Sequence, residues 1–275
     1  MATKKQNVKP ESIKLSKSKE IANWDEELAK YAQEASAMEA NSGGGQFFGL
    51  QSGILSWDGG AMPGNQMLVI ILDHIFETVF YDGPYNPDTP QSPVAFAFGR
   101  VQEELRWHEN SHEDFAGKLC SESEVCEWGS ADTGKGKAAR ETRRLAMIPA
   151  GVINRNGDIE LNEDPEFYKS SQIGFMKLPV TSVKGFAGFV KQVSGTLKRP
   201  PFGVFTKVSV VPDAKTQFKV VFEAIDPVDN ALMDAIMNRV KEVREVIDFP
   251  YQREEVSEVP VKSAKKKPVV KKKRY

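Results

Sequence analysis

The chain has 275 residues, of which 40% are hydrophobic and 27% charged, which is typical of a globular protein with one main domain. The longest apolar run, Met67 to Leu72, is too short to span a bilayer, and the lysine-rich start lacks the apolar stretch of a signal peptide. The 2 cysteines are too few for a disulfide scaffold. We therefore expect a cytoplasmic protein with no membrane partner.

The first part of the chain divides into two predicted segments. Residues 1–20 are rich in lysine and serine and are predicted to be disordered. Within 21–44, Trp24, Leu28 and Tyr31 fall at helical spacing, and a run of glycines follows. This pattern predicts an N-terminal helix and a glycine-rich linker over 21–44.

The predicted core covers residues 45–250 and begins with strands. Met67 to Tyr81 and Val94 to Phe98 are rich in β-branched, aromatic and other apolar residues, which favours strands. The proline-rich segment from Tyr81 to Pro93 excludes regular structure and predicts an extended loop. Glu103 to Gly117 is polar and predicts a loop or a short helix.

The second half of the core predicts further strands and a final helix. Its expected elements are strands at Leu145–Ile153 and Gln172–Val180, a short helix or strand at Val183–Val193, a hairpin of Val204–Val211 with Gln217–Ala224, and a helix at Asp229–Ile247. Many strands and few helices favour a β-rich α+β fold. An OB-like antiparallel β-barrel with a C-terminal helix and flexible tails fits this order best.

The last segment, 251–275, is predicted to be a disordered basic tail. From Lys262 onward it is lysine-rich and has no acidic residue, so the net charge of −1 conceals an acidic body and a cationic end. Such an arm binds polyanions without sequence preference, although a solubilising end has the same composition.

The stretch from Trp128 to Leu145 contains a Gly-Lys-Gly-Lys loop followed by a basic segment. Small residues let backbone N–H groups approach an anion, and nearby cations add charge. The candidate phosphate contacts are Lys135, Lys137, Arg140, Arg143 and Arg144. The pattern differs from a nucleotide-binding P-loop because Gly136 stands where the hydroxyl that holds Mg²⁺ should be.

Aromatic and basic residues alternate through the second half of the core, as in grooves where bases stack between phosphate contacts. The candidates for such a groove are Phe186, Phe189, Lys191, Lys198, Arg199, Phe202 and Lys207, together with Trp128 of the loop. Ordinary inside–outside alternation in half-buried strands gives the same pattern, so core packing of these aromatic residues is the alternative.

Four zinc-type side chains lie within one polar stretch. His108, His112, Cys120 and Cys126 have the spacing His-x3-His-x7-Cys-x5-Cys, which could provide a structural zinc site. The interval between the two cysteines is wider than the usual two to four residues. The alternative is two ordinary cysteines and two exposed histidines without metal, and no other cofactor is expected.

The sequence contains few patterns that would indicate an enzyme. It has no nucleophile elbow, His-Glu-x-x-His or dinucleotide fingerprint. Asp73 with Glu77, or Asp158 with Glu160, could hold a nuclease metal, but acidic pairs usually mark a solvated face. We predict a protein that is not an enzyme.

Several runs together resemble a group of bacteriophage proteins found in replication modules. These are Pro93-Val-Ala-Phe-Ala-Phe98, Cys120, Trp128-Gly-Ser-Ala, Gly134-Lys-Gly-Lys-Ala138 and Arg143-Arg-Leu145, within residues 45–250. The resemblance implies single-stranded DNA binding and, for a phage protein, a location in the host cytoplasm. Ser123 and Ala139 stand where the family pattern has further cysteines, so an inherited zinc site does not follow.

The sequence therefore predicts a non-enzymatic, largely sequence-independent single-stranded DNA-binding protein of phage replication or recombination, with replication or recombination proteins as further partners. A structural or interaction protein with a basic arm is the alternative, and a nucleotide-binding or nuclease enzyme is a lesser one.

Overall fold

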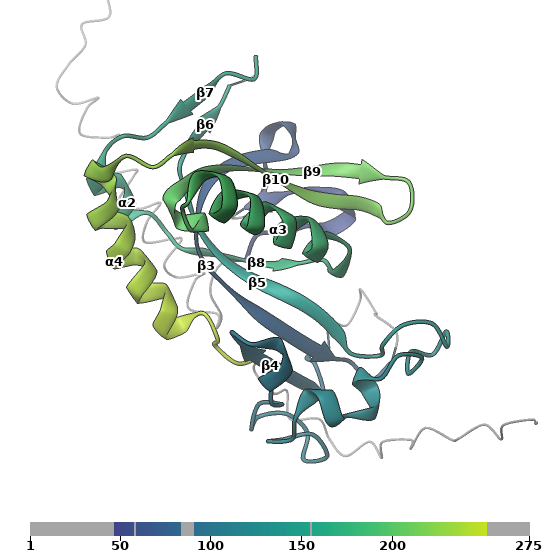
Figure 1. Cartoon of the computed structure of the whole chain (residues 1–275). Coiled ribbons are helices and arrows are strands. Elements are labelled where there is room, and N and C mark those ends of the chain that lie inside the picture. Colours follow the sequence, from purple (N-terminus) through teal and green to yellow (C-terminus); the bar gives the residue numbers. More distant parts are fainter. Residues whose placement is uncertain (1–46, 58, 84–90, 155, 252–275) are drawn as a thin grey trace, which may run out of the picture. The chain divides into compact units, whose positions relative to one another are not determined.

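The computed structural model describes residues 47–57, 59–83, 91–154 and 156–251. The predicted disordered segment 1–20, the helix and linker at 21–44, and all but the first residue of the predicted tail lie outside these ranges. The described residues form a strand-rich α+β fold (Figure 1).

The strands are β1 (Ser56–Trp57), β2 (Gly60–Ala61), β3 (Gln66–Phe80), β4 (Ala95–Gly99), β5 (Arg140–Pro149), β6 (Gly151–Ile153), β7 (Ile159–Leu161), β8 (Gly174–Leu178), β9 (Val204–Asp213) and β10 (Gln217–Pro227). The α-helices are α2 (Pro165–Ser170), α3 (Val180–Gln192) and α4 (Asn230–Val246). Short 3-10 turns, including Cys120–Glu122 and Glu124–Cys126, lie between β4 and β5.

The main sheet is built around β3, which is 15 residues long. The strand order is β10-β9-β3-β5-β8, with β4 also paired to β3, and every pairing is antiparallel. The run Met67–Leu72 of β3 is buried on both faces of the sheet, which explains its unbroken apolar sequence. The predicted strand at Met67–Tyr81 and the predicted hairpin are thus confirmed.

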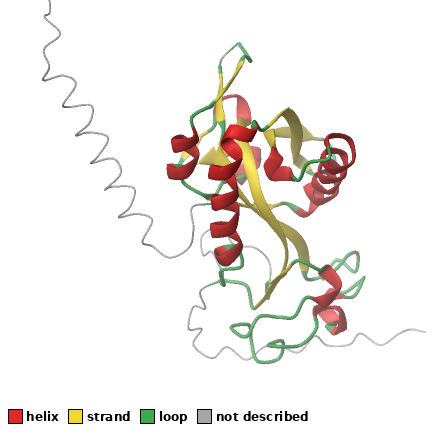
Figure 2. Ribbon diagram, turned by 60° about the vertical axis from the view of Figure 1, so that its left-hand side comes forward, coloured by secondary structure: helices red, strands yellow, loops and turns green. Residues whose placement is uncertain are grey.

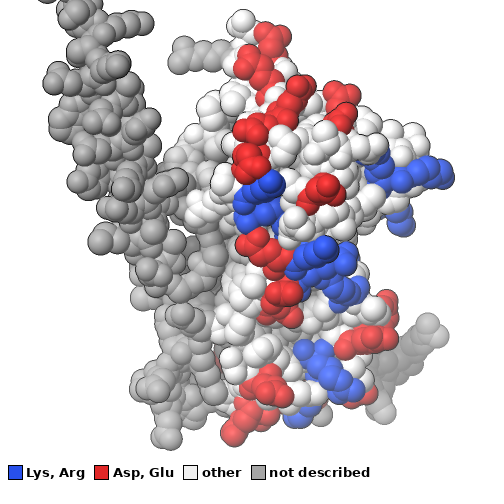
Figure 3. Space-filling model, turned by 90° about the vertical axis from the view of Figure 1, so that its left-hand side faces the viewer, with Lys and Arg blue, Asp and Glu red and all other residues white. Residues whose placement is uncertain are grey.

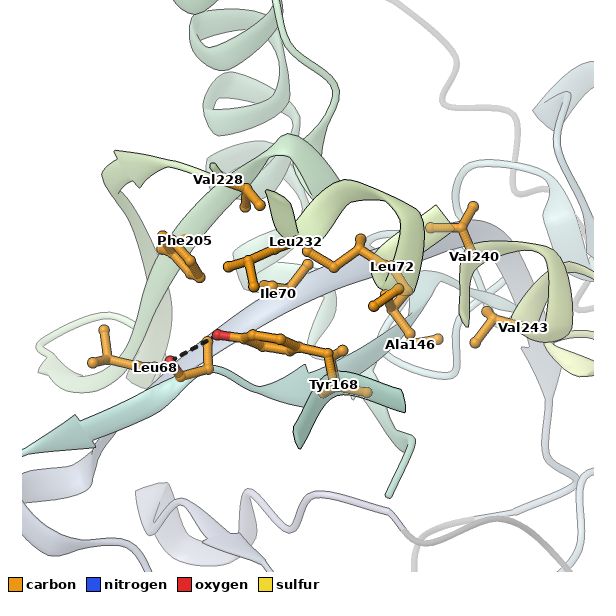
Figure 4. Close-up of a cluster of buried hydrophobic side chains, with 14 of the residues drawn as sticks. Leu68, Ile70, Leu72, Ala146, Tyr168, Phe205, Val228, Leu232, Val240 and Val243 are labelled. Carbon is orange, nitrogen blue, oxygen red and sulfur yellow. Dashed lines mark hydrogen bonds between the residues drawn. The ribbon is translucent and has the colours of Figure 1, made fainter. Parts of the chain in front are cut away.

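Helices cover both faces of this sheet (Figure 2). On one face, Leu232, Val240 and Val243 of α4 point toward Ile70 and Leu72 of β3 (Figure 4). The stripe that predicts this helix is therefore its buried face, and Asp229 caps the helix by accepting a hydrogen bond from the Ala231 amide at 2.7 Å. On the other face, α3 packs against β10 and β5.

The predicted OB-like barrel is not found among the described residues. The strand order ends at β10 and β8, and no recorded pairing joins those two strands, so the sheet is open. Alternating patterns predict antiparallel pairing but do not specify the tilt and stagger that close a barrel. Here the two faces are covered by α3 and α4 instead.

A third apolar cluster supports the segment between β4 and β5. It joins Ala95 and Ala97 of β4 to Leu105, Trp107 and Ala139, with both cysteines included. The polar segment Glu103–Gly117, predicted as a loop or a short helix, consists mainly of turns, and its residues Leu105 and Trp107 belong to this cluster. The cluster fixes the base of the glycine- and lysine-containing loop that follows.

Candidate nucleic-acid interface

The loop of residues 127–138 enters β5 from the third cluster and holds its shape through its own backbone. Gly129 and Gly136 have φ of +97° and +93°, and the Gly129 amide donates to the Gly136 carbonyl at 2.7 Å. Other residues rarely adopt such φ values. The amides of Ala131 and Gly134 also donate to carbonyls within the loop. The amides of Gly129, Ala131 and Gly134 are thus already paired, and cationic side chains are the loop's main means of holding an anion.

Trp128 is the most prominent side chain of this loop because 82% of its surface is exposed. Lys135 is also exposed. Lys137 is half-buried and binds Glu141 at 2.5 Å, so part of its charge is neutralised. The loop therefore presents an indole ring and two lysines, one of which is already paired.

The predicted strand at Leu145–Ile153 begins earlier in the structure, and β5 includes the basic residues. Arg140 is exposed, with its guanidinium carbon 5.8 Å from the ring centroid of Tyr81. Arg143 is half-buried and lies 3.4 Å from the ring centroid of Phe76. Burial lowers the pKa of Arg143, which reflects its partial loss of solvent. Arg140 is the more accessible of the two cations.

The prediction that Arg144 contacts a phosphate is wrong, because its side chain has no exposed surface. Its Nε donates to Glu77 at 3.2 Å, and its Nη1 donates to the carbonyls of Ile247 and Phe249. The guanidinium lies 4.1 Å from the ring centroid of Phe98. Arg144 joins the sheet to the chain after α4 and is not available to a phosphate.

The prediction that aromatic residues of the second half of the core stack bases is also corrected. Phe186 and Phe189 of α3 are 1% and 5% exposed and belong to the core between α3 and the sheet. Phe202 is half-buried against the α4 side of the core. Helical spacing turns both phenylalanines of α3 inward, so core packing, the alternative for this pattern, applies to them.

The remaining predicted cations are not gathered at the loop. Lys191 and Lys198 are exposed at the end of α3 and just after it. Arg199 donates to the Val228 carbonyl at 2.7 Å, and Lys207 of β9 binds Glu223 at 2.5 Å. On the side of the molecule that carries α4, acidic and basic side chains of the described residues are interspersed, and these residues form no continuous basic surface there (Figure 3).

The four candidate zinc ligands do not form a metal cluster. Among the described residues, no group of three or more His, Cys, Asp or Glu side chains is arranged to hold a metal ion. The Nδ1 atoms of His108 and His112 accept hydrogen bonds from nearby amides, and His108 stacks on Phe96. Burial raises the pKa of Cys120 to about 12 and that of Cys126 to about 11, which disfavours thiolates.

Of the carboxylates considered for a nuclease, Asp73 and Glu77 have cationic partners. Asp73 binds Arg100 through both oxygens, at 3.0 and 2.6 Å. Burial raises the pKa of Asp73, but the hydrogen bonds and charges of Arg100 and His74 together outweigh burial, so the pKa is lowered overall. Glu77 binds Arg144, and Glu160 accepts from Asn154 at 2.6 Å. The Asp73–Glu77 pair is therefore used in structural ion pairs.

Sequence reasoning missed a polar cluster at the end of β3. Lys177 of β8 donates to Tyr251 at 3.1 Å and to Tyr81 at 3.4 Å, and its Nζ lies 3.5 Å from Glu77. Tyr251, predicted as the first residue of the tail, stacks on Phe98 and also donates to Glu77. An acid such as Glu77 in a long, mostly apolar strand is the signal that could have revealed it, because a buried carboxylate requires a partner.

Comparison of the chain with protein-family models, curated proteins and solved structures gave no match. The likeness to the phage replication family therefore stays a prediction from the motifs. Over the part of the chain that the structure describes, no helix has the length and apolar character needed to cross a membrane.

Proposed function

We propose that this protein is a non-enzymatic single-stranded DNA-binding protein whose contact surface is centred on the loop 127–138. The observation that carries the proposal is the 82% exposure of Trp128 in the same loop as the exposed Lys135. Phage replication or recombination is the process in which we place it, from the resemblance of its motifs.

An exposed tryptophan beside lysines suits single strands for a physical reason. Every base has a flat π face, and stacking on an aromatic side chain contributes about 1–3 kcal/mol per base without reading its identity. Lysines and arginines neutralise phosphates and release counterions, which makes binding depend on salt. Trp128 would supply the first contribution, and Lys135 and Lys137 the second.

The surface proposed here is smaller than the sequence alone predicts. Arg144, Phe186 and Phe189 are left out because they are buried. Lys191, Lys198 and Lys207 are left out because they stand on α3, after it, or on β9. In Figure 1 the loop lies beyond the start of β5, away from α3.

The test is binding of a fluorescein-labelled oligo(dT) by the full chain, followed by anisotropy at several salt concentrations. We expect Lys135→Gln with Lys137→Gln to weaken binding about tenfold at low salt and to reduce the magnitude of the slope of log K against log [salt] by about 1.4, from two lost phosphate contacts. Trp128→Ala should weaken binding at every salt concentration with little change in slope.

Lys191→Gln is the matched control, because it removes one exposed positive charge on α3. It should bind like the wild type. If the loop variants and this control all bind like the wild type, the proposed interface is wrong, and a structural or interaction protein with a basic arm becomes the better assignment.

A further inference from the structure

Three polar side chains, those of Tyr81, Arg140 and Lys177, lie close together where β3, β5 and β8 are side by side. In the ladder, Val79 is paired with Arg140 and Arg144 with Lys177. Residues two or four positions apart in a strand share a face, so Arg140 and Lys177 lie on the face of the sheet that carries Arg144. Tyr81 follows β3 and is two positions beyond Val79, and its ring lies within 6 Å of both cations, with centroid distances of 5.8 Å to Arg140 and 5.5 Å to Lys177.

Counted over the described residues, this group has an excess of positive charge. Glu77 is fully buried and is the carboxylate bound by both Arg144 and Lys177. The single negative charge of Glu77 is therefore shared by two cations, and Arg140 adds a third positive charge. Glu141 follows Arg140 but lies on the other face, where it binds Lys137. Asp82 is exposed next to Tyr81 and has no ion pair with Arg140 among the described residues.

Two donor groups of this cluster, on Tyr81 and Arg140, have no hydrogen-bond acceptor among the described residues. Lys177 has three N–H groups, and its neighbours within bonding or ion-pair distance are Tyr81, Tyr251 and Glu77. The Tyr81 oxygen accepts from Lys177, and over the described ranges its own hydroxyl proton has no recorded acceptor. Arg140 likewise has no recorded hydrogen bond or ion pair there. Two donors are thus available beside a fixed cation.

Lys177 keeps its charge in this position. Burial lowers its pKa, but Glu77 and the two tyrosines outweigh that effect and the pKa is raised overall. About 30% of the side chain is exposed, so its positive charge acts on the adjacent solvent as well as on Glu77. The Tyr81 hydroxyl is polarised by this cation and becomes a better donor.

We propose that Tyr81 and Arg140 form a second subsite, which binds one backbone phosphate of the nucleic acid. Lys177, next to Tyr81, adds positive charge to this subsite. The Tyr81 hydroxyl and the Arg140 guanidinium donate to the phosphate oxygens, and the excess positive charge around Glu77 favours the anion. The subsite rests on the proposed function, and it extends the contact surface from the loop onto the edge of the sheet through Arg140, the first residue of β5.

The subsite has a signature that distinguishes a phosphate contact from a purely structural one. Tyr81→Phe removes only a neutral donor and should weaken oligo(dT) binding by the full chain about two- to tenfold, with an unchanged salt slope. Arg140→Gln removes a charge and should weaken binding and reduce the magnitude of the slope by about 0.7. If both contact one phosphate, the double variant should lose less than the product of the two single losses.

The loop variants separate this proposal from the proposed function. Normal binding by Tyr81→Phe and Arg140→Gln, together with weakened binding by Lys135→Gln with Lys137→Gln, overturns the subsite and leaves the loop interface in place. The reverse result supports the subsite and overturns the loop interface. Equal thermal midpoints for wild type and variants show that the chain remains folded, and a Tyr81→Phe defect with a lowered midpoint counts against a phosphate contact.

Discussion

Glu77 and Arg144 form an ion pair with no exposed surface on either side chain, across the ladder between β3 and β5. Glu77 also faces Lys177, so it is the only carboxylate among the described residues that is paired with either of these two cations. The guanidinium of Arg144 in turn holds the carbonyls of Ile247 and Phe249, after the end of α4. One buried pair thereby connects the centre of the sheet to the last described residues.

We therefore expect Glu77→Gln to lower the free energy of unfolding by about 3–5 kcal/mol, because it leaves buried cations without a counterion. The double variant Glu77→Gln with Arg144→Met should cost less than the sum of the two single changes. Urea denaturation followed by circular dichroism measures all three. Strict additivity would show that the two side chains do not stabilise each other.

Gly174 in β8 is predicted to be intolerant of any side chain. A Cβ atom there would lie 2.2 Å from Cζ3 of Trp57 and 2.5 Å from Cε2 of Phe48, two rings that stack on each other at 4.1 Å. Gly174→Ala should cost about 1–3 kcal/mol of stability, since the rings must move. Chemical denaturation at equilibrium gives the value.

Gly185 provides the matched control for this substitution. It lies on the exposed side of α3, and nothing would approach its Cβ within 4 Å. Gly185→Ala should stabilise the protein by about 0.5–1 kcal/mol through helix propensity. A loss at Gly185 equal to that at Gly174 would contradict the packing explanation for Gly174.

The two cysteines should behave as protected thiols. Burial raises their pKa values to about 12 and about 11, so at pH 8 the folded protein should react with Ellman's reagent far more slowly than the unfolded chain. The raised pKa values also make stability depend on pH, because the folded values lie above the unfolded value near 9. The contribution of the protonated thiols to the free energy of unfolding is present below pH 9 and is lost as the pH rises toward 11 and 12.

Replacing both cysteines with alanine should flatten the alkaline loss of stability, though Tyr168 and Tyr251, whose pKa values are raised to about 12, still contribute. The comparison uses the slope of stability against pH, which is unaffected by a constant packing cost. Zinc bound in near-stoichiometric amount to protein purified without chelator, and lost in the double variant, would contradict protonated thiols.

Trp128 should dominate the quencher-accessible fluorescence of the described residues. Trp107 is 1% exposed and Trp57 is half-buried, whereas Trp128 is 82% exposed. In a Trp24→Phe background, which removes the tryptophan outside the described residues, Trp128→Phe should remove most of the emission that iodide quenches, and oligo(dT) should protect Trp128 from iodide. Equal iodide quenching with and without saturating oligonucleotide would place the bound strand away from this indole.

The pattern of apolar and polar residues along the chain was sufficient to predict many of the secondary-structure elements. The apolar run in β3, the β9–β10 hairpin and the apolar stripe of α4 all predict the elements observed, because each depends on residues close together in the chain. The open sheet was not predictable in this way. Closure depends on curvature and on which helix covers which face, and both involve residues far apart in sequence.

The loop shows the same division within the candidate site. The sequence shows that the Gly-Lys-Gly-Lys loop contains small residues, and in the structure both Gly129 and Gly136 have positive φ values. That their amide and carbonyl bind each other, and so do not form an anion cradle together, follows only from the folded loop. Tyr81 lacked any sequence signal because its partners come from β5 and β8.

The sequence by itself determined the local elements and the chemical character of the basic segment that leads into β5. Only the tertiary structure decided which of its arginines meets solvent. Arg140 and Arg144 lie four residues apart on the same face of one strand, yet Arg140 is exposed and Arg144 is fully buried. The difference comes from the segment after α4, more than a hundred residues away in the chain, whose carbonyls cover Arg144 and do not reach Arg140.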